Sequence, residues 1–102
     1  MDASSPLERL RSLEAEDALL GAATAAGEAV PAQWRALTPG RALKLLRKRR
    51  RLTQDRLARL AGMRQAWVAR VERGAETTLV TLARLYAALG YELVLIPARR
   101  TR

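Results

Sequence analysis

Residues 53–74, TQDRLARLAGMRQAWVARVERG, constrain the fold most strongly, because they predict two short helices joined by a tight turn. Thr53 is a good N-cap for the first helix, since its hydroxyl can accept a hydrogen bond from an otherwise unpaired N–H of the first turn. Gly62 can adopt the positive φ that such a turn favours. Helical spacing places three residues on one apolar face of the first helix, namely Leu57, Ala58 and Ala61.

The second helix of this segment has a shorter apolar stripe, Val68 and Val71, which we predict to be core. Two helices that meet across a tight turn form a helix-turn-helix, in which the second helix enters the major groove of DNA. The outer face of the second helix carries Arg64, Gln65, Ala66, Trp67 and Arg70. The segment therefore predicts a protein that binds double-stranded DNA.

Three motif elements occur in order across residues 39–90: TQxxLAxxAG, VxRVERG and TLxTLxxLxxALG. Together they resemble the Cro/lambda-repressor-like (Xre) helix-turn-helix domains. The segment Thr77–Pro97 also resembles HipB-type antitoxins, in which the last helix continues into a single β-strand, and the triplet Arg64-Gln65-Ala66 fits that subgroup. The resemblance implies a mainly α, lambda-repressor-like bundle. It also implies a dimeric repressor, the antitoxin of a type II toxin–antitoxin operon, which binds its own operator and a cognate toxin such as a HipA-like kinase.

The resemblance also implies roles for individual residues. Gln54 matches a glutamine that hydrogen-bonds a DNA phosphate and supports the recognition helix, and Arg47 and Glu72 match an internal salt bridge. The family usually has glycine where this chain has Arg51. A left-handed non-glycine residue costs roughly 1–2 kcal/mol, so we expect a rearranged turn there.

The outer face of the second helix offers side chains that suit base edges. Gln65 can pair with adenine, Arg64 and Arg70 with guanine or a phosphate, and Ala66 can contact a thymine methyl. Trp67 stands where the family commonly has a small Ser or Thr. Two interpretations stay open for it: the ring packs against the sugar-phosphate backbone, or it fills a gap between helices.

A single β-strand is predicted at Tyr91–Ile96 (YELVLI), which is followed by Pro97. A lone strand leaves its N–H and C=O groups unpaired, and an unpaired apolar edge is unfavourable in water. The simplest partner is the same strand of a second copy across a two-fold axis. The residues predicted to hold this homodimer are Tyr91, Leu93, Val94, Leu95 and Ile96.

Charge is distributed unevenly along the chain. Residues 1–37 carry six acidic and three basic side chains, whereas residues 38–102 carry four acidic and sixteen basic ones, so the net charges are −3 and +12. This asymmetry indicates a polyanion-binding half joined to a different one. The basic run Arg47–Arg51 fits either a solvated helix end or additional phosphate attraction.

We predict four segments along the chain. They are an acidic helical extension (1–37), a helix-turn-helix domain (38–90), the dimerising strand (91–97) and a basic tail (98–102). Within the extension, Ser5, Pro6 and Glu8 form a capping box that starts a helix to about Leu20. Gly21–Ala29 is predicted as a second short helix. The extension is either an arm that contacts the toxin or a helix that covers the domain's own core.

A last helix is predicted between Thr78, as its N-cap, and Gly90, as its terminator. Its inner face comprises Leu79, Leu82, Leu85, Tyr86 and Leu89. A helix before the motif is expected to start at Thr38-Pro39 and to run to about Arg50.

The composition excludes several classes of function. The chain has no cysteine and no histidine, so disulfides, thiolate or zinc sites and a histidine general base are excluded. No apolar run reaches the about 18 residues of a membrane span, and the N-terminus lacks a signal-peptide layout. We therefore expect a cytoplasmic protein that is not an enzyme and needs no cofactor or metal. The alternatives to an antitoxin are a free-standing phage or housekeeping repressor, and a protein-interaction adaptor that kept the fold.

Overall fold

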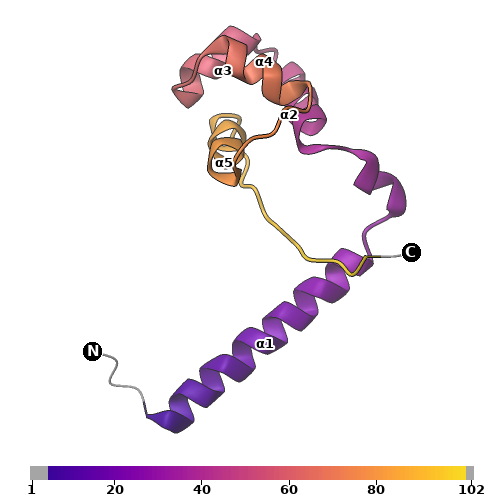
Figure 1. Cartoon of the computed structure of the whole chain (residues 1–102), viewed down its shortest axis with the longest axis vertical. Helices are drawn as coiled ribbons and strands as arrows, with labels where there is room; N and C mark the ends of the chain where they lie inside the picture. The colour runs from indigo at the N-terminus through magenta and orange to yellow at the C-terminus, as the bar shows by residue number, and fades with distance from the viewer. Residues whose placement is uncertain (1–4, 101–102) are drawn as a thin grey trace. The chain divides into compact units, whose positions relative to one another are not determined.

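The computed structural model of the protein describes residues 5–100, which form five α-helices and one 3-10 helix (Figure 1). In chain order these are α1 (Pro6–Glu28), η1 (Ala32–Ala36), α2 (Pro39–Arg49), α3 (Gln54–Ala61), α4 (Gln65–Glu72) and α5 (Leu79–Ala88). The chain divides into two compact units. The central unit is Ala32–Val94, and the terminal unit comprises the described parts of Met1–Pro31 and Leu95–Arg102.

Helices α2 to α5 enclose the hydrophobic core of the central unit. The buried apolar residues are Leu43, Leu57, Ala58, Ala61, Val68, Val71, Leu82, Leu85, Tyr86 and Leu89. The apolar faces predicted for residues 53–74 are thus confirmed. On α5 the prediction was wrong for Leu79, which is 56% exposed, because it begins the helix one turn before the apolar stripe reaches the core.

Threonine side chains start three of the four helices of the core. Thr53 Oγ1 accepts a hydrogen bond from the Arg56 N–H at 3.0 Å, so the predicted cap of α3 is confirmed. The same bond recurs at α2, where Thr38 accepts from Arg41, and at α5, where Thr78 accepts from Thr81. Each cap satisfies one N–H that has no partner within its helix.

Two glycines end helices as predicted. Gly62 has φ 70° at the end of α3 and Gly90 has φ 86° after α5. The Tyr91 N–H donates to the Tyr86 carbonyl at 2.9 Å and the Gly90 N–H to Ala87 at 2.9 Å. This pair of bonds satisfies carbonyls at the end of α5 and requires a left-handed residue, which glycine adopts without steric cost.

The turn after α2 keeps the left-handed conformation despite the non-glycine residue there. Arg51 has φ 56°, so the expectation of a rearranged turn was wrong. The Leu52 N–H donates to the Arg47 carbonyl at 3.2 Å, and Arg47 Nη1 donates to the Leu52 carbonyl at 2.8 Å. These two hydrogen bonds join Arg47 and Leu52 and fix the backbone of the turn. The turn therefore tolerates the strain of a left-handed Arg51.

Helix α1 begins as predicted and continues further than predicted. Ser5 Oγ accepts from the Glu8 N–H at 3.1 Å and Glu8 Oε2 accepts from the Ser5 N–H at 3.2 Å, which is the predicted capping box. The helix does not end near Leu20 but runs unbroken through Gly21 to Glu28. Glycine costs about 1 kcal/mol in a helix, and the alanine-rich sequence around it favours continuation. No helix in residues 5–100 is long and apolar enough to cross a membrane.

Residues 91–97 are not a β-strand in the structure, and no strand occurs anywhere in residues 5–100. After the Tyr91 N–H the segment has no regular hydrogen bonding, so the predicted strand is corrected to irregular chain. A strand needs a second extended segment beside it, and the described part of a single copy offers none. Leu93 packs against the core, whereas Tyr91, Val94, Leu95 and Ile96 are exposed.

Candidate nucleic-acid interface

The start of α4 projects three of the predicted contact residues into solvent. The Met63 N–H donates to the Ala58 carbonyl at 2.8 Å, which closes the turn between α3 and α4. Arg64 occupies the N-cap position of α4 with an extended backbone, and its side chain makes no capping bond. Arg64, Gln65 and Ala66 are all exposed. This is the position from which a recognition helix contacts base edges.

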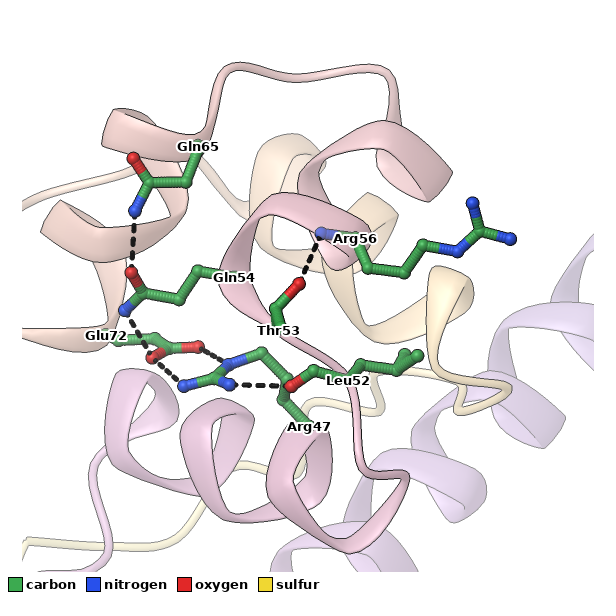
Figure 2. A network of polar contacts seen from close by, with 7 residues as sticks. All are labelled: Arg47, Leu52, Thr53, Gln54, Arg56, Gln65 and Glu72. Carbon is green, nitrogen blue, oxygen red and sulfur yellow. Dashed lines mark hydrogen bonds and ion pairs between the residues drawn. The ribbon is translucent and has the colours of Figure 1, made fainter.

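A chain of side-chain hydrogen bonds joins Gln65 to the interior of the central unit (Figure 2). Gln65 Nε2 donates to Gln54 Oε1 at 2.8 Å, and Gln54 Nε2 donates to Glu72 Oε1 at 3.0 Å. A glutamine amide has two N–H donors and one acceptor oxygen. The bond to Gln54 therefore leaves Gln65 one donor and its oxygen, which is the pair needed for adenine N7 and N6.

Figure 2 shows that this series of hydrogen bonds leads to a buried ion pair between α2 and α4. Arg47 Nε donates to Glu72 Oε2 at 2.6 Å, and Arg47 Nη2 donates to Glu72 Oε1 at 2.9 Å. The two helices approach so closely that a Cβ at Gly40 would clash with the Val71 carbonyl oxygen. The bidentate pair thus fixes α4, and through Glu72 and Gln54 it fixes Gln65.

Electrostatics favour the ionised state of this pair. Burial alone would raise the pKa of Glu72, but hydrogen bonds from Arg47 and Gln54, with the charges of Arg47 and Lys44, lower it below its usual value. The hydrogen bond to Glu72 raises the pKa of Arg47. Glu72 is consequently a carboxylate at neutral pH, and it can only accept from Gln54. The carboxylate therefore determines which end of the Gln54 amide faces it.

Trp67 and Arg70 form a second pair on α4. Trp67 was predicted on the outer face of α4, and this was wrong in part, because its side chain is half-buried and packs against the core. The guanidinium carbon of the exposed Arg70 lies 5.2 Å from the centroid of the Trp67 ring. This distance is within the range of a cation–π interaction.

The sequence motif and this geometry agree with a comparison against protein families. A family model described as a helix-turn-helix domain matches residues 40–97, which is more than half of the chain. The chain belongs to this helix-turn-helix family. A search of curated proteins found no match, and neither did a search of solved structures. The family points to a DNA-binding regulator, and it does not identify a subgroup or an operator.

The basic residues Arg47–Arg51 of this helix-turn-helix protein lie in two different environments. In Arg47–Arg51, the side chain of Arg47 is buried with Glu72, whereas Lys48, Arg49, Arg50 and Arg51 are exposed. Arg47 is therefore structural, and the four remaining cations can attract phosphate. In residues 5–100, no group of three or more carboxylates is arranged to hold a metal ion.

Three contacts of the interface were not predicted from the sequence: Gln65 with Gln54, Gln54 with Glu72, and Trp67 with Arg70. The resemblance implied only that Gln54 supports the recognition helix, and both partners of its side chain belong to α4. The bond between Gln65 and Gln54 joins residues 11 positions apart, and no local spacing rule indicates it. The contact between Trp67 and Arg70 had an available signal, because residues three apart are neighbours on a helix surface. The predicted ion pair between Arg47 and Glu72 is present.

Proposed function

We propose that the protein is a sequence-specific transcriptional repressor that binds a palindromic operator as a homodimer. The observation that supports this most is the hydrogen-bonded series from Glu72 through Gln54 to Gln65, which holds an amide on the exposed start of α4. Gln54, Arg64, Gln65, Ala66, Trp67 and Arg70 form the proposed DNA-binding surface. The net charge of +12 on residues 38–102 supports a polyanionic ligand.

The experiment measures binding to the DNA upstream of the protein's own gene by fluorescence anisotropy at several salt concentrations. If six or more phosphates are neutralised, raising salt from about 50 to 200 mM lowers affinity by about 10³-fold or more. Gln65→Ala should weaken binding by about 1–3 kcal/mol and relax the preference at one base pair. Salt-independent binding would favour the adaptor alternative, and unchanged operator affinity in folded Gln65→Ala would remove Gln65 from the surface.

We further propose that residues 91–97 pair as strands between two copies. The exposed apolar side chains of Val94, Leu95 and Ile96 support this, because pairing would cover them and satisfy the backbone. Val94→Pro removes an N–H in the middle of the ladder and should give a monomer that keeps the helices but loses most operator affinity. Light scattering measures this, with Val94→Ala as the control. If Val94→Pro remains a dimer, another surface joins the copies.

The proposed antitoxin role rests on the likeness of Thr77–Pro97 to HipB-type proteins. It is supported by the acidic α1, whose exposed leucines offer apolar area to a partner such as a HipA-like kinase. Co-expression with the product of the adjacent gene, followed by co-purification, tests it. A toxic neighbour that is neutralised and bound supports the antitoxin, and the absence of any neighbouring toxin supports a free-standing repressor.

A further inference from the structure

The exposed side chain of Arg70 lies over the ring of Trp67. An arginine that only keeps the surface soluble does not need such a contact. Trp67 packs against the core, and the guanidinium carbon of Arg70 lies over its ring, 5.2 Å from the ring centroid. The ring is thereby held by the core, and Arg70 is held by the ring. An arginine on an exposed helix face would otherwise sample many rotamers.

The contact leaves the hydrogen-bonding capacity of Arg70 unused. The ring face attracts the cation and accepts none of its N–H groups in a conventional hydrogen bond. Within residues 5–100, the Arg70 side chain makes no ion pair and no hydrogen bond. All five N–H donors are consequently available for a ligand. Arg47 is the contrasting case, because Glu72 and the Leu52 carbonyl occupy its donors.

Arg64 provides a comparison on the same helix. It is exposed at the N-cap of α4, and no cap bond, ion pair or ring contact holds its side chain in the described structure. A side chain without a support must be ordered on binding, which suits a phosphate contact that tolerates several geometries. A supported planar guanidinium suits a base contact, in which two donors must match guanine O6 and N7.

We propose that Trp67 is a positioning residue that holds Arg70 for bidentate hydrogen bonding to a guanine of the operator, whereas Arg64 contacts phosphate. This inference rests on the proposed function, and it adds a base pair and a mechanism of specificity to it. Trp67 acts through Arg70 and does not itself read a base.

The test uses the full chain and a duplex DNA library with about 20 randomised base pairs, enough for two half-sites about one helical turn apart. Sites selected by the wild type should contain a G·C pair whose enrichment disappears with Arg70→Ala. At this pair the variant should lose about 5- to 150-fold in discrimination. Trp67→Ala should lose about two- to fivefold at the same pair, and the double variant should be no worse than Arg70→Ala.

Two conservative variants separate positioning from a structural role. Trp67→Phe keeps an aromatic face and should keep the preference for guanine. Arg70→Lys keeps the charge but loses the planar fork, so it should lose the preference. Arg64→Lys should change no base preference. If Trp67→Ala lowers affinity equally for all sequences and leaves every preference intact, Trp67 is only structural and the inference is overturned.

The failure of this inference is distinguishable from failure of the proposed function. A wild-type chain that enriches no sequence, or whose binding does not depend on salt, contradicts the proposed function itself. A wild type that selects a defined operator, while Arg70→Ala selects the same operator, contradicts only the assignment of Arg70. Additive losses in the double variant at the guanine pair contradict the coupling to Trp67.

Discussion

Helices α1 and α3 differ in what they do with their apolar residues, although a side-chain cap starts each of them. Leu57 and Ala58 of α3 are buried in the core, whereas Leu7, Leu10 and Leu13 of α1 are each more than half exposed. A cap satisfies N–H groups at the first turn and acts locally. Burial depends on other helices being placed against the face. The comparison thus shows that a cap and local sequence are enough to form a helix, whereas a core forms only where other helices cover its apolar face.

The same contrast holds for acidic side chains in the two units. Glu72 lies beneath the interface with Arg47 and Gln54 as partners, and Glu14 lies on the exposed surface of α1. Stability in the central unit therefore depends on individual side chains more strongly than stability in α1. Paired substitutions, one in each region, measure this difference directly.

The first pair is Glu72→Ala and Glu14→Ala. Removing one partner of a buried ion pair leaves Arg47 uncompensated, so Glu72→Ala should lower the free energy of unfolding by about 3–5 kcal/mol. Glu14→Ala should change it by no more than about 0.5 kcal/mol. Urea unfolding followed by circular dichroism provides both values. Comparable losses in the two variants would show that the buried pair has no special importance.

The Glu72 pair also makes stability depend on pH. Because the folded-state pKa of Glu72 lies below its ordinary value of 4.5, its contribution is complete above that pH and is lost as pH falls through the folded-state pKa. In Glu72→Gln this contribution is absent, so the stability of the variant should fall less steeply below about pH 4.5. Parallel acid unfolding curves for the two proteins would contradict this.

The second pair is Leu57→Ala and Leu13→Ala. The first leaves a cavity in the core and should cost about 2–5 kcal/mol. The second removes a side chain that is 61% exposed and should cost less than about 0.5 kcal/mol in the isolated chain. Thermal unfolding at matched protein concentration measures both. A large loss from Leu13→Ala would mean that the leucines of α1 are covered in solution, for example by a second copy.

Apart from the two control substitutions in α1, the smallest expected effect is a gain, from Arg51→Gly. Glycine adopts φ 56° without the steric cost of a side chain, but it loses more entropy on folding, so we expect a net gain of about 0.5–1 kcal/mol. Arg49→Gly, in the last turn of α2, is the control and should cost up to about 1 kcal/mol. Equal losses in both would indicate that the turn is not strained by its arginine.

Helix starts, the glycine turn and the recognition helix were predictable from the sequence, because each depends on residues within about four positions of one another. Thr53, Gly62 and Gly90 act on their own turn of chain, and the apolar stripes of α3 and α4 repeat at helical spacing. The same local rules placed the break of α1 wrongly at Gly21, because one unfavourable residue is outweighed by the helix formers around it.

Other features were decided only by tertiary structure. The bonds that join Gln65 to Gln54 and Gln54 to Glu72 cross 11 and 18 residues, and they exist because packing of α3 against α4 brings these side chains together. Packing also holds the ring of Trp67 under Arg70. Sequence alone determined that Arg64, Gln65, Ala66 and Arg70 face outward at the recognition helix, but it did not determine that Trp67 packs against the core. Only the packed core determined which of them are held in place, because their supports come from other elements of the chain or from the core itself.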